Sequence, residues 1–165
     1  MSLSRSAIKR KTALKRVPVP RRDREARARA EKTIRRQRDT GPTPVQRYAV
    51  AWRANWCCEL CGTQLGDPGH PPRWYEAHSF HHRRPRAMGG TRRVETNEPP
   101  NLLLLCGSAT TPGGCHQRVE SDRAAARAAG WLLTQTQDPA TVPVDITAGA
   151  GPVLLTPDGR YERTL

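Results

Sequence analysis

Residues 101–116 read NLLLLCGSATTPGGCH, and this stretch decides how the middle of the chain is expected to fold. The four leucines, 102–105, predict a short buried strand. Cys106 and Cys115 then enclose eight residues rich in Gly, Ser and Thr, a composition typical of a loop. His116 follows directly and opens a segment with helical composition. The stretch therefore predicts a strand, a loop between two cysteines, and a helix.

Cys106 and Cys115 are the second cysteine pair of the chain, and the first pair, Cys58 and Cys61, lies upstream in the run CCELC at residues 57–61. Zinc takes four ligands in a tetrahedron, with each thiolate sulfur at about 2.3 Å. Two cysteine pairs from distant segments supply such a set. We therefore expect a structural Zn²⁺ bound by Cys58, Cys61, Cys106 and Cys115.

Other uses of the cysteines compete with this assignment. Cys57 directly precedes a ligand, so we expect it to stay outside the site. Cys58 and Cys61 could instead join His78 and His82 in a zinc-finger site of two cysteines and two histidines, with sixteen residues between the two pairs. Buried free thiols are the third possibility. A disulfide framework is disfavoured, because the cysteine count is odd and no secretory leader is expected.

The positive charge of the chain lies mainly at one end. Lys and Arg number 28 against 15 Asp and Glu, and the net charge is +13. Residues 1–40 carry +11 of it, and the remaining 125 residues, at +2, are long enough to bury a core. We therefore divide the chain into a basic arm, 1–40, largely disordered or helical only on DNA, and a folded domain, 41–165. Such an arm favours nucleic acid as a partner.

The apolar content excludes two classes of protein. No apolar run approaches the roughly 18 residues of a membrane span, and residues 1–17 contain no apolar stretch that could serve as a signal peptide. The sequence therefore predicts a cytoplasmic protein with no membrane contact.

The folded domain is expected to mix short helices and strands, which places it in the α+β class. After Gly41, Thr43 and Pro44 suit the N-cap and the first position of a helix. Its apolar positions recur at helical spacing and are expected to pack on the core: Val45, Tyr48, Ala49, Trp52 and Trp56. The other expected elements are a strand at 74–82, a buried strand at 102–105, a helix at 115–129 stopped by Gly130, and short strands at 131–134, 142–146 and 153–156.

A histidine doublet lies between the cysteine pairs. His81-His82 is followed by Gly89-Gly90, by Asn101 with its apolar run, and by Cys115-His116. In this order the residues resemble the HNH endonuclease family, and the wording around the second cysteine pair is similar to HNH proteins of actinobacterial phages. The resemblance covers residues 56–129. It implies a ββα-metal finger built around the four-cysteine zinc, with the C-terminal residues 131–165 outside the motif core.

The resemblance also implies roles for individual residues. His81 is expected to bind a catalytic divalent metal, and His82 to act as the general base. Asn101 is expected to hold the loop or the ring of the base by hydrogen bonding. His116 is expected to be a metal ligand at the start of the helix.

Two further positions leave alternatives open. Glu120 lies one helical turn after His116, where some members of the family have another ligand, and a carboxylate beside imidazoles suits Mg²⁺ or Mn²⁺. The alternative is a solvated Glu120 paired with nearby arginines. Asn97 is a rival to Asn101, although no apolar strand follows it.

The pattern as a whole predicts a metal-dependent HNH endonuclease that hydrolyses phosphodiester bonds, most simply in double-stranded DNA. The similarity to phage proteins adds genome processing or packaging beside a terminase, in the host cytoplasm. A non-catalytic zinc module that binds nucleic acid through the arm is the alternative, and it would not need the histidines or Asn101. Five arginines flank the doublet and are expected to hold the DNA backbone: Arg83, Arg84, Arg86, Arg92 and Arg93.

Overall fold

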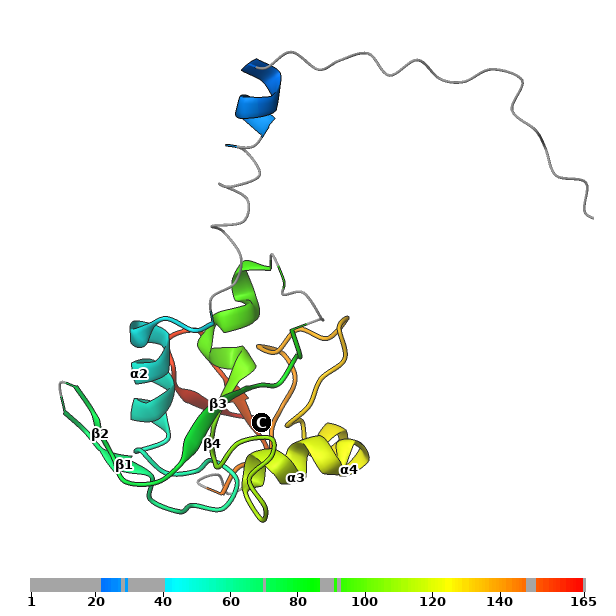
Figure 1. The fold of residues 1–165 in the computed structure, drawn as a ribbon. Coiled ribbons are helices and arrows are strands. Elements are labelled where there is room, and N and C mark those ends of the chain that lie inside the picture. The colour runs from blue at the N-terminus through cyan, green and yellow to red at the C-terminus, as the bar shows by residue number, and fades with distance from the viewer. Residues whose placement is uncertain are drawn as a thin grey trace, which may run out of the picture. The chain divides into compact units, whose positions relative to one another are not determined.

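The computed structural model describes residues 22–27, 29, 41–69, 71–86, 91, 93–147 and 151–164 (Figure 1). The chain divides into two units, residues 1–37 and 38–165. In the first unit the described residues 22–27 and 29 are helical. The disorder expected at the start of the arm lies outside the described residues. None of the helices in the described part is long and apolar enough to cross a membrane.

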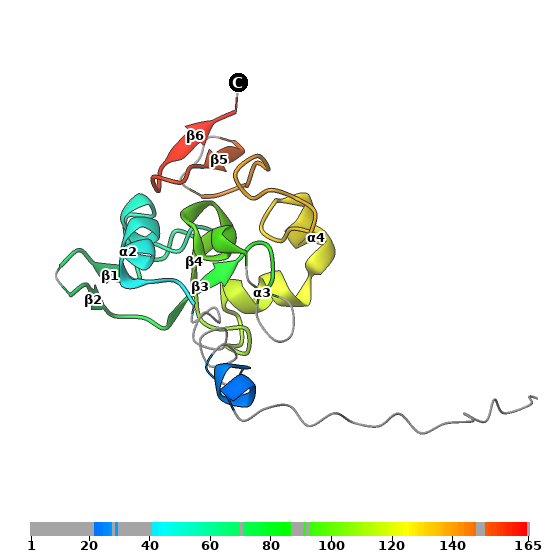
Figure 2. The same ribbon diagram turned by 90° about the horizontal axis from the view of Figure 1, so that it is seen from above.

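The second unit is a mixed α+β fold with small antiparallel sheets, centred on the pair β3 (His78–His82) and β4 (Leu102–Cys106). The register places His82 opposite Leu102 and His78 opposite Cys106. All four leucines of β4 are fully buried, as the apolar run predicts. β4 contacts α2 (Pro44–Arg53) and α3 (Cys115–Ser121), which lie on either side of the β3–β4 pair (Figures 1 and 2).

The α2 helix begins where the sequence predicts, but its buried face differs from the expected one. Thr43 caps the helix with Gln46 in a reciprocal capping box, and a proline occupies the first turn. The helix buries Val50 and Ala51, whereas Val45 and Trp52 are 78% and 62% exposed. The expectation that Val45 and Trp52 pack on the core is therefore wrong.

The segment expected to be one helix, 115–129, contains two. After α3 the chain breaks at Asp122, whose side chain accepts a hydrogen bond from Ala125 N at 3.0 Å and caps α4 (Arg123–Ala128). Gly130 ends the helical segment as predicted, at φ +72°, and a Cβ there would clash with the carbonyl of Pro143.

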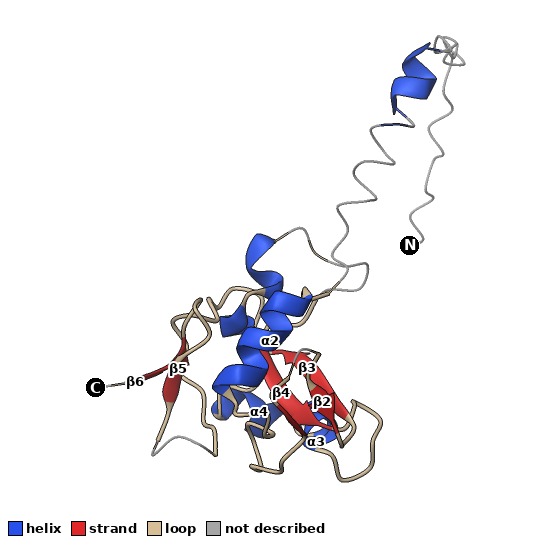
Figure 3. Cartoon of the chain, turned by 90° about the vertical axis from the view of Figure 1, so that its left-hand side faces the viewer, coloured by secondary structure: helices blue, strands red, loops and turns tan. Residues whose placement is uncertain are grey.

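The remaining strands form two short pairs. β1 (Gly66–Asp67) pairs with β2 (Arg73–Trp74), so the strand expected at 74–82 is interrupted before β3. β5 (Val153–Leu155) pairs with β6 (Tyr161–Arg163), apart from the β3–β4 sheet (Figures 2 and 3). The expected strand at 131–134 is absent from these described residues, and 142–146 contributes only the bridge from Val144 to Val153.

A buried ion pair joins α2 to the first cysteine pair. Glu59 lies between Cys58 and Cys61 and accepts hydrogen bonds from Arg53 Nε at 2.9 Å and from Leu104 N at 2.7 Å. The Tyr161 hydroxyl donates a further bond at 2.8 Å. The two charged side chains are each 1% exposed. The turn from Cys58 to Cys61 is therefore fixed to β4 by the carboxylate of Glu59, which is fully paired.

Candidate metal centres and active site

The four cysteines expected to bind zinc come together at one place. The Sγ atoms of Cys58, Cys61, Cys106 and Cys115 all lie within 4.8 Å of one another. Cys61 Sγ and Cys106 Sγ are 3.8 Å apart. Two sulfurs bound to one zinc at about 2.3 Å in a tetrahedron would be separated by about the same distance. The cluster can therefore hold a metal ion, and its geometry is compatible with structural zinc.

Local backbone structure brings the second pair of cysteines together. Cys106 ends β4, and Gly107 follows with φ +73°, a conformation that turns the chain away from the strand. The loop returns at Cys115, whose backbone N–H donates to Cys106 Sγ at 3.3 Å. Backbone N–H groups directed at a sulfur are favourable for a thiolate.

The environments of the four thiols differ. Burial raises the pKa of Cys58 to about 11 and also raises that of Cys115. At Cys61 burial also acts to raise the pKa, but hydrogen bonds to Thr63 and to neighbouring thiols outweigh it and lower the pKa to about 7. Because zinc binds thiolates, a metal ion would have to displace protons from the two buried thiols.

Cys57 and the rival zinc ligands lie elsewhere. Cys57 Sγ contacts Gln64 Oε1 at 3.0 Å and is outside the cluster. His78 stacks on Trp74, with ring centroids 3.6 Å apart. The alternative site of two cysteines and two histidines is therefore wrong, because its histidines are not in the cluster with the cysteines.

A second cluster contains the three residues expected to bind the catalytic metal. Ligand atoms of His81, His116 and Glu120 lie within 4.8 Å of one another. His81 is on β3, and the other two are one turn apart on α3. The ring centroids of the two histidines are 5.0 Å apart. A strand and a helix thus present two imidazoles and a carboxylate to one point.

Hydrogen bonding leaves one nitrogen of His81 available for that point. His81 Nε2 lies 3.2 Å from the carbonyl oxygen of Trp131. Because a carbonyl only accepts, Nε2 must carry the proton and Nδ1 the lone pair. Nδ1 lies 3.9 Å from Glu120 Oε1, and two ligands about 2.1 Å from one ion can be separated by up to about 4.2 Å.

His81 is also kept neutral. The side chain is 3% exposed. Burial, followed by the neighbouring His116, lowers the pKa of His81 to about 3, and the charge of His82 acts in the same direction. A neutral imidazole is the form that binds a metal ion.

His116 has a hydroxyl partner, Ser79, that no motif in the sequence indicates. Ser79 Oγ lies 2.7 Å from His116 Nδ1. When Nδ1–H donates to this hydroxyl, Nε2 carries the lone pair that a ligand needs. Burial lowers the pKa of His116. Ser79 and His81 lie on the same face of β3, because side chains alternate along a strand, and α3 covers that face.

Glu120 lies close to the two imidazoles and also pairs with an arginine, as the alternative for this position expects. Its Oε1 faces His81, and its Oε2 accepts from Arg123 Nη1 at 2.7 Å. The side chain is 34% exposed. The ion pair with Arg123 leaves the other oxygen directed at the two imidazoles.

His82 ends β3 and is oriented by Asn97. His82 Nε2 lies 2.9 Å from Asn97 Oδ1. An amide oxygen only accepts, so Nε2 carries the proton and Nδ1 carries the lone pair. That tautomer gives His82 the basic nitrogen that proton abstraction requires.

Asn101 holds the loop that follows the doublet. It is fully buried, and its Oδ1 accepts from Arg84 N at 2.7 Å. Its Nδ2 donates to Thr96 O at 2.8 Å, in the 3₁₀ turn Val94–Asn97. The two rival asparagines therefore have separate partners. Asn97 contacts the ring of His82, and Asn101 binds the backbone of Arg84 and Thr96.

The two arginines that directly follow the doublet are buried. Arg83 is 0% exposed, and all five of its guanidinium hydrogen bonds go to backbone carbonyls. Arg84 is 7% exposed and pairs with Glu95 at 2.9 Å. The expectation that these two arginines hold DNA is wrong, because their side chains are buried. Arg86 is exposed, Arg93 donates to Gln135 O at 2.8 Å, and Arg92 lies outside the described residues.

Comparisons of this chain with protein-family models, with curated proteins and with solved structures returned no match.

Proposed function

We propose that this protein is a metal-dependent endonuclease of the HNH type, in which β3, β4 and α3 form the ββα-metal finger. One observation carries the proposal: His81, His116 and Glu120 converge on one point, and the next residue along β3, His82, is a histidine bonded to Asn97. A structural protein has no need for three imidazoles that are each held by a hydrogen bond, to Trp131 O, Ser79 Oγ and Asn97 Oδ1. Hydrolysis of a phosphodiester needs a base for water and stabilisation of the charge that develops on phosphate.

In the proposed mechanism His82 takes the proton from the attacking water. Its Nδ1 accepts the proton, while Nε2–H stays bonded to Asn97 and holds the ring in place. Water attacks phosphorus in line with the departing 3′ oxygen. The departing 3′ oxygen takes a proton from solvent water, so the products carry a 5′ phosphate and a 3′ hydroxyl.

The ligands for a divalent ion would be His81 Nδ1, His116 Nε2 and a Glu120 oxygen. A bound Mg²⁺ or Mn²⁺ would stabilise the negative charge on the phosphate and on the leaving oxygen. Trp131 O and Ser79 Oγ orient the two imidazoles. In the same proposal, the four cysteines bind a structural Zn²⁺ that fixes the end of β4 relative to the start of α3.

The substrate that best fits the charge is DNA. The net charge of +13 is concentrated in the arm, which would contribute affinity without chemistry. We take double-stranded DNA as the proposed form of the substrate. By analogy with the phage proteins that the motif resembles, genome processing beside a terminase is the proposed setting.

The direct test is the nicking of supercoiled plasmid by purified protein. Wild-type protein should nick the plasmid with Mg²⁺ or Mn²⁺ and not with EDTA. His82→Ala should lower the rate by about 10²–10⁴-fold, the usual contribution of general-base catalysis. Tyr75→Leu is the control, because Tyr75 is an exposed ring outside both metal clusters and outside the lining of the pocket between α2 and residues 71–74. DNA binding without metal-dependent nicking would favour the non-catalytic zinc module instead.

A further inference from the structure

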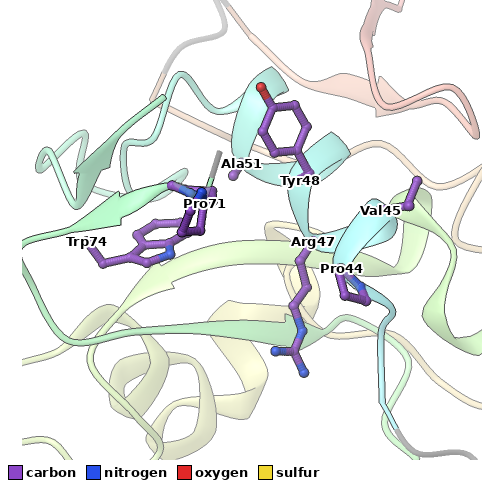
Figure 4. Close-up of a pocket in the computed structure, with 8 residues that line it drawn as sticks. Pro44, Val45, Arg47, Tyr48, Ala51, Pro71 and Trp74 are labelled. Carbon is purple, nitrogen blue, oxygen red and sulfur yellow. The ribbon is translucent and has the colours of Figure 1, made fainter. Parts of the chain in front are cut away.

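A pocket of about 500 Å³ opens between α2 and the segment 71–74 (Figure 4), and none of its lining residues belongs to either metal cluster. Tyr48 and Trp74 contribute aromatic walls, and Pro71 and Pro72 extend the apolar surface. Of the described residues that line the pocket, Arg47 alone is charged, and its side chain is exposed. The pocket therefore combines aromatic rings with one cation and no carboxylate.

The pocket is connected to the strand face that ends at His82. Phe80 and His82 lie on the same face of β3, because side chains alternate. The guanidinium of Arg47 lies 5.9 Å from the centroid of the Phe80 ring. Trp74 meets the same ring edge-to-face, with centroids 6.3 Å apart. Two residues of strand, about 7 Å, separate Phe80 from His82.

The chemistry of the walls identifies the kind of ligand. Aromatic side chains stack on nucleobases, and an arginine beside them can pair with the adjoining phosphate. The volume of about 500 Å³ accommodates a nucleobase. A base inside a duplex is stacked on both faces by its neighbours, so only an unpaired base can stack on Trp74 or Tyr48. A strongly basic chain also favours a polyanion over an apolar peptide.

We propose that this pocket binds one unpaired nucleobase, with Tyr48 and Trp74 against the base and Arg47 at its phosphate. The position next to the His82 face rests on the proposed nuclease function, whereas base binding by itself does not require cleavage. The proposal narrows the substrate to DNA that presents an unpaired base near the cleaved bond. Extrusion of a paired base from a duplex costs a few kcal/mol. The cost is smaller at a mismatch, and a single-stranded base needs no unpairing.

The test measures binding without added Mg²⁺ or Mn²⁺. Three labelled probes are titrated by fluorescence anisotropy: an oligothymidylate, an abasic oligomer of the same length and charge, and a fully paired duplex. Wild-type protein should prefer the oligothymidylate to the abasic oligomer. Trp74→Leu should weaken oligothymidylate binding by about 5-fold or more, the lower range for one base–aromatic stack, and leave duplex binding within about twofold.

Tyr75→Leu is the matched control. Tyr75 is the adjacent aromatic residue, 49% exposed and outside the pocket lining, so its loss should leave all three affinities unchanged. Because Trp74 packs against the core, the wild-type protein provides a second measurement that needs no variant. Ultraviolet irradiation should cross-link an oligomer that contains 5-bromouracil to Trp74 or Tyr48.

The outcomes separate this proposal from the nuclease proposal. Equal wild-type affinity for the thymidine and abasic probes, or cross-links confined to other segments, would overturn the base pocket even if plasmid is cleaved. If Trp74→Leu kept the base preference, the preference would arise elsewhere on the protein, and the base pocket would also be overturned. The groove would then be free to bind a protein partner instead. A base preference lost in Trp74→Leu, in a protein that cleaves no DNA, would support the pocket and reject the nuclease.

Discussion

Replacement of Arg83 by Met should destabilise the folded domain instead of acting on DNA contacts. The Arg83 guanidinium donates five hydrogen bonds, 2.8–3.3 Å long, to the carbonyl oxygens of Pro100, Gly130, Pro139, Val142 and Pro143. Methionine fills a similar space with an apolar chain but has no donor. The substitution therefore removes the hydrogen bonds while largely preserving the packing.

The size of the effect follows from the burial of these carbonyls. The bonds to Gly130, Pro100 and Pro139 are fully buried, whereas those to the other two carbonyls are partly accessible to water. Three buried acceptors left without donors cost about 2 kcal/mol each. Burial lowers the pKa of Arg83 to about 10 from 12.5, which shows that the buried charge itself is unfavourable. Its removal therefore offsets about 3 kcal/mol of this loss. The free energy of unfolding should fall by about 3 kcal/mol, out of a typical 5–15 kcal/mol.

Urea unfolding of the zinc-loaded protein, followed by tryptophan fluorescence, measures this loss. Arg86→Met is the control: Arg86 is exposed in the same loop, so its replacement should change stability far less. An Arg83→Met variant that is as stable as wild type but binds DNA more weakly would contradict a structural role for the five hydrogen bonds. Arg83 would then have the DNA-binding role that the sequence predicts.

Three further predictions concern the zinc cluster, the arm and the buried histidine. Cys106→Ser should lose the bound zinc together with the compact fold, whereas Cys57→Ser should retain both, and elemental analysis that finds unchanged zinc in Cys106→Ser would contradict the four-cysteine site. Deletion of residues 1–40 should weaken DNA binding but leave cleavage at saturating protein intact. It should also flatten the salt dependence of binding, because each phosphate contact contributes about −0.9 to the slope of log K against log salt. A truncated protein that is folded but inactive would give the arm a catalytic role. Because burial and His116 hold the pKa of His81 near 3, against the usual 6.5, the folded state should lose stability as pH falls below about 6.5 towards 3, by up to about 1.4 kcal/mol per pH unit. His81→Gln should reduce this slope in urea unfolding between pH 6.5 and 5 without added Mg²⁺ or Mn²⁺, and an identical slope would show that His81 is not the group responsible.

The parts of the site that sequence could predict are those with a local signal. The leucine run predicts β4, and the cysteine pairs predict the sulfur cluster, because metal ligands must converge whatever the intervening chain does. The spacing of His116 and Glu120 by one helical turn likewise places both on one face of α3. These patterns depend on short stretches and on the identity of the ligands.

The parts that could not be predicted depend on contacts between distant segments. Arg83 appears as a cation in a basic loop, and nothing local indicates that carbonyls 17–60 residues away surround it. Asn97 and Asn101 are equivalent in composition, and only the fold assigns one to the ring of His82 and the other to the loop backbone. The break between α3 and α4 had a signal, since Asp122 is a good N-cap residue within an alanine-rich run.

A metal titration of plasmid cleavage by three variants distinguishes the general base from the metal ligands. His82→Ala keeps the expected ligands, so its rate should stay low, by about 10²–10⁴-fold, at every concentration of Mn²⁺. His81→Ala and His116→Ala each lack one ligand, so part of their activity should return as Mn²⁺ is raised. Rescue of His82→Ala by metal, with none for His81→Ala, would reverse the roles of the doublet. Unchanged cleavage in all three variants would contradict the proposed mechanism altogether.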